Sequence, residues 1–279
     1  MTSVLETLGC AWRNPRGRLG AVLLLLVTLA AFIGPWLLPD PLAQPDILAG
    51  SLPPGLGHPF GTDQLNRDIL ARVVAGARVS LAVALLAVSL SMTLGAAIGI
   101  VSGYCGGLVD AVLMRVVDGA LAIPRLFMLL LVLAVWERVP VLALILLIGA
   151  TGWFPTSRIV RAEVLRLREE SYVRAAEALG ARRRRIIFRH LLPNALGPLL
   201  VAATLAIGDV ILLEAGLSFL GLGIQPPTPS WGGMILDSKE VLVSAPWAGI
   251  FPGIAIVITV LSANLFGDAL RDAVDPRSA

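Results

Sequence analysis

The sequence predicts an all-α, polytopic membrane protein with six transmembrane helices. Of its 279 residues, 57% are hydrophobic and 15% are charged, with a mean hydropathy of +0.85. Soluble domains carry about 25% charged residues. Six segments approach the roughly 20 apolar residues that a helix needs to cross a bilayer. They are Leu19–Leu38, Val79–Val101, Ala120–Trp136, Val139–Phe154, Leu196–Leu222 and Trp247–Phe266, the third and fourth joined by a turn at Glu137-Arg138 and Pro140.

The basic residues predict the orientation, because cytoplasmic loops accumulate arginine. Arg13, Arg16 and Arg18 precede the first span, so both termini are expected in the cytoplasm of a bacterium, with Arg271 and Arg277 also inside. The outer loops hold only Arg67, Arg72, Arg78, Arg138 and Lys239, and Arg125 is expected near the inner boundary. A cleaved signal peptide is the alternative for the first span, but its apolar run is long and lacks a small-x-small site.

Composition and missing motifs exclude several function classes. The pI of about 9.4 reflects one-sided loop arginines, so no nucleic-acid partner is expected. Cys10 and Cys105 fall on the cytoplasmic side as reduced thiols, and His58 and His190 lie on opposite sides, so no metal site or cofactor is expected. A phosphate-binding loop needs Gly-Lys-Ser/Thr, yet the single lysine, Lys239, follows Ser238. This chain is therefore not expected to be an enzyme.

The segment Arg158–Asn194 is the longest polar stretch between apolar segments. It contains ten arginines, which are residues 158, 161, 166, 168, 174, 182, 183, 184, 185 and 189. Such a stretch lies in water, and its apolar spacing fits a broken pair of amphipathic helices. The apolar positions are Ile159, Val160, Val164, Leu165, Leu167, Val173, Ala176, Leu179 and Ile186. A helix pair held out from a membrane protein predicts a docking partner.

Two outer segments are predicted to do more than connect spans. In Pro39–Arg78, Thr62 or Asp63 can cap an interfacial helix that leads into the second span. In Gly223–Ala245, prolines and glycines exclude a continuous helix, and Trp231 and Trp247 suit the membrane–water boundary.

Some residues within the spans have alternative roles. The stripe Gly95, Gly99 and Gly103 predicts ordinary close helix packing, with its partner helix open. Asp209 is the candidate for a translocation path, because ionisable groups at membrane depth face water or a polar partner. Glu214, five residues on, is on a different helix face and near the outer end, where solvation accounts for it. A cytoplasmic-edge ionic cluster is predicted from Asp110, Arg115 and Asp118.

The sequence YVRAAEALGARRRRIIFRHLLPN, from Tyr172 to Asn194, resembles the "EAA" signature of permeases of ABC importers. That signature is Glu-Ala-Ala-x3-Gly followed nine residues later by Ile-x-Leu-Pro. Arg174 stands at its glutamate and His190 at its isoleucine, departures that resemble the dipeptide/oligopeptide/nickel branch. In this role, small residues let a helix sit in a partner's groove, Gly180 permits a sharp turn, and Pro193 restarts the chain toward the fifth span. The resemblance implies ATPase-coupling residues Tyr172, Arg174, Ala175, Ala176, Gly180, Ile186, His190, Leu192 and Pro193.

Further resemblances extend over nearly the whole chain. HPFGTDQLNRDILARVVAGARVSL resembles the family's outer segment, with Asn66 and Ala71 where glycine and serine are usual. Gly103–Pro124, GWFPTSRIVRAEVLRLRE, Glu214–Ile235 and Asn264–Pro276 resemble later family segments. The implied fold is that of a type I importer permease, here the second, C-type subunit of a pair. The implied partners are another permease, ATP-binding subunits, an extracytoplasmic binding protein and membrane lipid.

We therefore expect residues 1–78 to form a tail, first span and outer segment, and residues 79–279 to form the permease core with the coupling region 158–194. Short peptides are the expected substrate, with nickel or a nickel chelate as the alternative. A stand-alone channel or secondary transporter would repeat ionisable groups at mid-bilayer, and only Asp209 is there. A membrane enzyme would need a nucleophile–base constellation.

Overall fold

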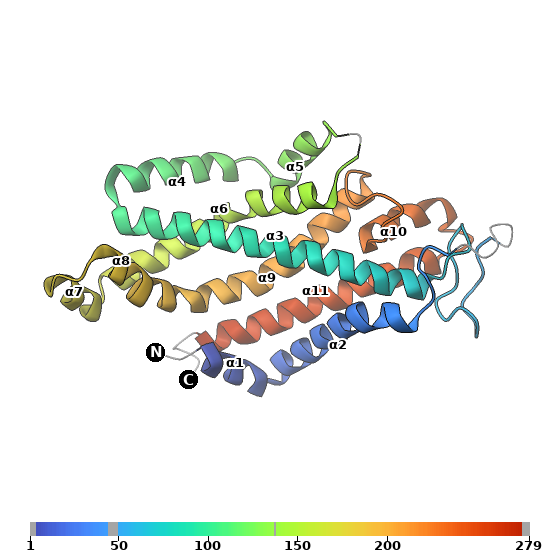
Figure 1. Ribbon diagram of the computed structural model, residues 1–279, viewed down its shortest axis with the longest axis horizontal. Coiled ribbons are helices and arrows are strands. Elements are labelled where there is room, and N and C mark those ends of the chain that lie inside the picture. The colour runs from blue at the N-terminus through green and yellow to red at the C-terminus, as the bar shows by residue number, and fades with distance from the viewer. Residues whose placement is uncertain (1–3, 44–49, 137, 275–279) are drawn as a thin grey trace.

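The computed structural model describes residues 4–43, 50–136 and 138–274, so the predicted turn residue Glu137 and the terminal Arg277 lie outside the described residues. Within these ranges regular structure is helical, apart from one isolated bridge between Thr62 and Asp68. Among the described residues, five helices are long and apolar enough to cross a membrane, and they run side by side along the long axis (Figure 1). They are α2 (Pro15–Leu37), α3 (Ile69–Cys105), α6 (Val141–Arg168), Arg183–Phe219, which contains α9 (Leu192–Phe219), and α11 (Trp247–Val274). The predicted all-α, polytopic class is confirmed.

The third predicted span, Ala120–Trp136, is wrong as a continuous helix. The chain instead forms α4 (Gly107–Leu121) and α5 (Arg125–Leu133), which are bent by 79° at the break between them and count together as one broken span. Pro124 explains the break, because it has no N–H and disfavours helical backbone at the residue before it. As a result Arg125, which was predicted to lie near the inner boundary, is the first residue of α5.

The glycine stripe of α3 packs against α6, so α6 is the partner helix that the sequence left open. A Cβ at Gly95 would lie 2.5 Å from the Cβ of Thr156, and one at Gly99 would lie 2.6 Å from the backbone oxygen of Ser157. In return, a Cβ at Gly149 would lie 2.7 Å from a side-chain carbon of Leu90. Small residues on both helices let the two backbones approach closely. The predicted close packing is confirmed, and α3 and α6 form the central pair of the bundle.

The second span begins earlier than predicted and is not preceded by a separate interfacial helix. Asp68, rather than Thr62 or Asp63, caps α3, and its side chain accepts a hydrogen bond from the N–H of Ala71. The helix then runs without interruption for 37 residues to Cys105. Its first turn is buried, because the loop before it folds back over it.

The two ends of the bundle differ in construction. We call the end that carries residues 50–68 and α10 (Trp231–Ser238) the loop end, and the end that carries α7 (Ser171–Ala178) and α8 (Arg183–Ile186) the hairpin end. The short helix α1 (Val4–Arg13) and the last turns of α11 also lie at the hairpin end (Figure 1). There Ala11 packs against Ala269 and Leu270.

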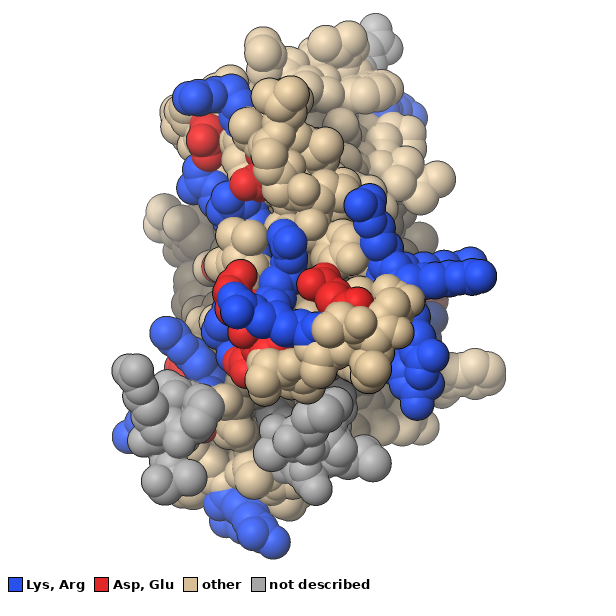
Figure 2. Space-filling view, turned by 90° about the vertical axis from the view of Figure 1, so that its left-hand side faces the viewer, with Lys and Arg blue, Asp and Glu red and all other residues tan. Residues whose placement is uncertain are grey.

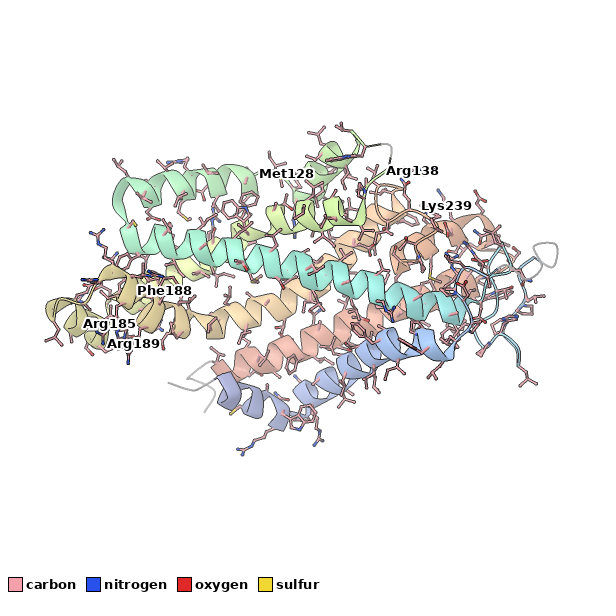
Figure 3. The ribbon with its side chains drawn as sticks, in the orientation of Figure 1. Met128, Arg138, Arg185, Phe188, Arg189 and Lys239 are labelled. Atoms are coloured by element: carbon pink, nitrogen blue, oxygen red, sulfur yellow. The ribbon has the colours of Figure 1, made fainter. Side chains whose placement is uncertain are left out.

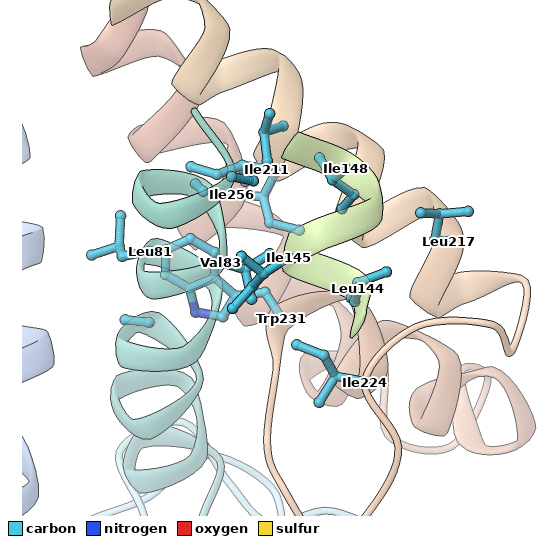
Figure 4. Packing of buried hydrophobic residues seen from close by; sticks show 14 of the residues in the cluster. Leu81, Val83, Leu144, Ile145, Ile148, Ile211, Leu217, Ile224, Trp231 and Ile256 are labelled. Atoms are coloured by element: carbon cyan, nitrogen blue, oxygen red, sulfur yellow. The ribbon is translucent and has the colours of Figure 1, made fainter. Parts of the chain in front are cut away.

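The main core lies in the loop-end half of the bundle, where side chains from α3, α6, α9 and α11 meet (Figure 4). Trp231 is at its centre, with 1% of its surface exposed and its indole N–H donated to the backbone oxygen of Val73 at 2.9 Å. Trp231, which was expected to suit the membrane–water boundary, is thus buried inside the chain. Its ring fills the core and fastens α10 to α3.

Candidate functional site: the α6–α9 hairpin

The candidate site is the hairpin between α6 and α9. Helix α6 continues past Phe154 to Arg168, α7 follows, and α8 starts the return. The sequence predicted that a new helix would begin at Pro193 on the return arm, and this prediction is wrong. Instead, α8 passes through a π-helical turn at Ile187–Leu191 directly into α9, and Arg183–Phe219 is one helix. Both arms of the hairpin are thus continuous with spanning helices.

Gly180 makes the sharp turn that the sequence predicts. Its φ is +77°, in the left-handed region that favours glycine. The N–H of Ala181 donates to the oxygen of Ala176 at 3.0 Å, and the N–H of Gly180 donates to that of Glu177 at 2.9 Å. This pair of bonds is a Schellman motif, which ends a helix by reversing the chain.

One small apolar cluster holds the hairpin against the bundle. Val173 of α7, Ile186 of α8 and Leu191 of the π turn are at most 1% exposed. They pack with residues at the ends of α6 and α3, which are Val160, Val164, Leu167, Ala96 and Ile100. Ile186, which was predicted to contact an ATPase, is buried inside the chain, so its part is to fix α8 in place.

The predicted residues of α7 lie on both of its faces. Arg174 pairs with Glu169 at the surface, Ala175 is exposed and Ala176 is half-buried. The ring of Tyr172 lies 6.0 Å from that of His190, between centroids, so the two arms of the hairpin meet there. Burial, assisted by the carboxylate of Glu170, raises the pKa of the Tyr172 phenol.

A hollow of about 560 Å³ opens between the two arms of the hairpin. It is lined by Ala176, Leu179, Gly180, Ala181, Arg182, Arg185 and His190. Leu192 is half-buried against the apolar cluster and Pro193 is exposed, both outside this hollow. The structure therefore brings Ala176, Gly180 and His190 together and leaves Leu192 and Pro193 apart from them.

Leu179 is a surface residue that the sequence analysis assigned to the apolar face. It is 89% exposed at the tip of α7. A helical wheel predicts this exposure. Leu179 follows buried Val173 by six residues, and at about 100° per residue the two side chains lie on different faces of the helix. Arginine side chains surround this tip, seen face-on in Figure 2, and Arg185, Phe188 and Arg189 project from the return arm in Figure 3. Phe188 is 61% exposed.

The predicted ionic cluster exists with different partners. Asp110 accepts two hydrogen bonds of 2.5 Å from Arg161 and is also bonded to Ser102, while Asp118 pairs with Arg158. These arginines come from α6, so the cluster fastens α4 to α6. Arg115, on the exposed side of α4, was the wrong partner because sequence neighbours on a helix need not face each other.

Two acidic residues of α9 have opposite environments. Glu214, which was expected to be solvated, is 1% exposed and bonded to Ser218 at 2.8 Å and Ser80 at 3.4 Å. It thereby joins α9 to α3. Asp209 is exposed on the surface of α9, although it lies in the middle of the helix.

At the loop end, a buried network of charges ties the loop to α10. Arg72 is 3% exposed, and its guanidinium lies 3.4 Å from Asp63 Oδ2 and 3.3 Å from Asp237 Oδ2. Arg67 Nε lies 2.7 Å from the same Asp63 oxygen. Burial raises the pKa of Asp237, although Arg72 and Arg67 oppose the shift. In the sequence, only the i, i+4 spacing of Asp63 and Arg67 signals any part of this network, and the other pairings were not predicted.

Comparisons with known proteins agree with this architecture. Residues 95–279 match the family model described as the binding-protein-dependent transport system inner membrane component. A putative peptide transport system permease protein of Brucella abortus is 44% identical over 95% of this chain and 89% of its own length. The dipeptide transport system permease protein of Alkalihalophilus pseudofirmus is 40% identical over 95% and 87%. The oligopeptide transport system permease protein of Bacillus subtilis is 38% identical over 95% and 86%. The chain therefore belongs to the family of binding-protein-dependent transport system inner membrane components.

Proposed function

We propose that this chain is one of two permease subunits of an ATP-driven importer of short peptides, with the α6–α9 hairpin as its contact for an ATPase. The observation that carries this proposal is an exposed hairpin tip, α7, that lies between the extensions of two spanning helices, α6 and Arg183–Phe219. Leu179 and Ala175 offer an apolar surface there, and a hollow opens beside them. Exposed apolar surface of this kind marks an interaction site.

The continuity of the helices supports a mechanical role. α6 runs for 28 residues, or about 42 Å at 1.5 Å per residue, from the loop end to the hairpin. The apolar cluster around Val173 and Ile186 attaches α7 and α8 to that helix. A displacement applied to α7 therefore moves α6 and α9 together, and these helices carry it across the bilayer. This is the bistable rearrangement that alternating access requires.

The substrate class is taken from the relatives. Those named above act in peptide, dipeptide and oligopeptide transport, which favours a short peptide over the nickel or nickel-chelate alternative. We propose that ATP is hydrolysed by partner subunits and that this chain is not itself an enzyme. Residues 1–78 would form the accessory first span and outer segment, and residues 79–279 the permease core.

The proposed orientation places the hairpin end in the cytoplasm and the loop end outside. The arginines of the segment 158–189 gather at the hairpin end, as the positive-inside rule requires. Both termini would then be cytoplasmic. A second permease would complete the path, ATP-binding subunits would dock on α7, and an extracytoplasmic binding protein would deliver the peptide to the loop end.

The test is Gly180→Val in the complete importer, expressed in cells that lack other peptide uptake. A β-branched residue cannot adopt φ +77° without strain, so the turn and the position of α7 change. We expect uptake of a radiolabelled dipeptide to be abolished, while the amount of chain in the membrane is unchanged.

Gly221→Val is the matched control. Gly221 has φ +81° and forms the same Schellman motif at the loop end, where the N–H of Leu222 donates to the oxygen of Leu217. Valine at Gly221 should cause the same backbone strain as valine at Gly180, but Gly221 lies at the other end of the bundle from α7. Normal uptake by the Gly180→Val importer would contradict the coupling role. If both variants lost ATPase binding equally, the effect of Gly180→Val would be general misfolding and the coupling role would again be contradicted.

A further inference from the structure

Arg125 and Asp209 occupy the same depth in the bundle. Arg125 contacts Thr151, which is ten residues from the first residue of α6, and Asp209 is ten residues from the last residue of α9. Ten helical residues span about 15 Å, which is half of a bilayer core of about 30 Å. Both groups therefore lie near the middle of the membrane, where α5, α6 and α9 meet.

The guanidinium of Arg125 is held in place by hydrogen bonds to α6. Its Nε donates to Thr151 Oγ1 at 3.1 Å, and its Nη2 donates to the backbone oxygen of Ile148 at 2.5 Å. A Cβ at Gly152 would lie 2.9 Å from Nη2, so the missing side chain leaves room for the guanidinium. The bonds to α6 engage two of its five N–H donors and hold the group in one orientation.

Asp209 supplies the opposite charge. It lies on α9, which packs against both α5 and α6, and no ion pair within 4.0 Å joins it to Arg125 among the described residues. Asp209 is exposed on the side of α9 that its own chain leaves uncovered. A carboxylate exposed at this depth faces water or a polar partner and not lipid.

The break between α4 and α5 points to the same place. Arg125 directly follows Pro124, where the helix is bent by 79°. Non-helical backbone at membrane depth is tolerated where it is buried in protein or lines a water-filled cavity. A broken helix, a positioned cation and an exposed anion thus converge at mid-membrane.

We propose that Arg125 and Asp209 form a station in the translocation path that binds the charged ends of a zwitterionic peptide. Arg125 binds the terminal carboxylate and Asp209 the terminal ammonium. This inference rests on the proposed function. The charged ends of the peptide lose their hydration water inside the membrane, and two fixed charges of opposite sign compensate for that loss. Because each end is bound by a single contact, the peptide can still be released.

The first test uses the complete importer reconstituted in vesicles with its binding protein and ATPases. Arg125→Gln and Asp209→Asn remove each charge with little change of shape. We expect ATP hydrolysis within about twofold of the unmodified importer and at least about tenfold less radiolabelled dipeptide imported per ATP. Arg78→Gln, which removes an exposed arginine of α3, is the control and should import normally.

The outcomes separate this inference from the proposed function. An unmodified importer that takes up no dipeptide overturns the proposed function, and this inference with it. An unmodified importer that is active, with both variants importing normally per ATP, overturns the inference alone. So does a parallel loss of ATP hydrolysis and import, because that result indicates a structural pair.

A second test applies where a variant fails to assemble. Cys10 and Cys105 are exposed and are first replaced by alanine. Asp209→Cys should then react with a water-soluble, charged thiol reagent, because the proposal places this position in a water-accessible path. Ile211→Cys, at a site that is 1% exposed, should not react. No labelling at position 209 overturns the proposal.

Discussion

The loop end and the hairpin end of this protein are stabilised in different ways. At the loop end, Arg72 and Arg67 lie between two carboxylates, the rings of Phe60 and Phe251 stack with centroids 4.0 Å apart, and Trp231 fills the core. At the hairpin end, α7 is held by an apolar cluster, and arginine side chains gather on the surface around it (Figure 2). Both ends leave apolar side chains exposed, Leu56 and Val243 at the loop end and Leu179 at the hairpin tip, but among the described residues only the loop end is also tied together by a buried charge network. Changes at the loop end should therefore alter stability, and changes at the hairpin tip should alter association.

The largest expected effect is at the loop end. Arg72→Met removes one of the two buried cations between the Asp63 and Asp237 carboxylates and leaves Arg67 to neutralise both. Removing one partner of a buried pair costs about 3–5 kcal/mol. The thermal unfolding of the purified protein in detergent should reveal this loss. Arg78→Met, at an exposed position of the same helix, should shift the transition little, and an equal shift would contradict the buried network.

A smaller effect is expected from the apolar cluster of the hairpin. Ile186→Ala removes buried atoms and leaves a cavity, at a cost of about 2–4 kcal/mol. Because the cluster holds only the hairpin, the cost should appear as faster hydrogen exchange in α7 and α8, with the loop end unchanged. Ile159→Ala, at a residue that is 42% exposed, serves as the control. Uniformly faster exchange would show that the two ends unfold as one unit.

The two Schellman glycines test the turn alone. Alanine at Gly180 or Gly221 meets no atom within 4 Å, so its cost is the strain of a positive φ, about 1–2 kcal/mol at either position. We expect equal losses of unfolding free energy but a reduced uptake of peptide only for Gly180→Ala. Reduced uptake for both would mean that the loop-end turn also controls transport.

The smallest expected effect on stability is at the hairpin tip. Leu179 is 89% exposed, so Leu179→Glu should change the free energy of unfolding by less than about 0.5 kcal/mol. Co-purification of the ATP-binding subunits should nevertheless fall sharply, because a charge replaces an apolar contact. Retention of those subunits would place the docking surface elsewhere on the hairpin.

The sequence predicted elements well where a signal is local. Gly180 is a turn because a left-handed position favours glycine, and the glycine stripe of α3 marks a close helix contact because its spacing repeats on one face. It failed where a single residue interrupts a long apolar run. Pro124 breaks the third span, yet apolar composition alone predicted continuity. The 37-residue length of α3 was also missed, because the polar residues of its first turn are neutralised by distant partners.

The sequence by itself determined the all-α membrane class, the positions of most spans and the location of the hairpin, because apolar run length, loop arginines and glycine turns are local properties. Only the tertiary structure decided which charges meet. Asp110 pairs with Arg161, Arg72 with Asp237, and Arg125 bonds to Thr151, each across a large separation in the chain. Glu214 and Asp209, five residues apart, differ in burial because their faces of α9 meet different neighbours. Such pairings depend on helix packing in three dimensions, for which no short sequence pattern exists.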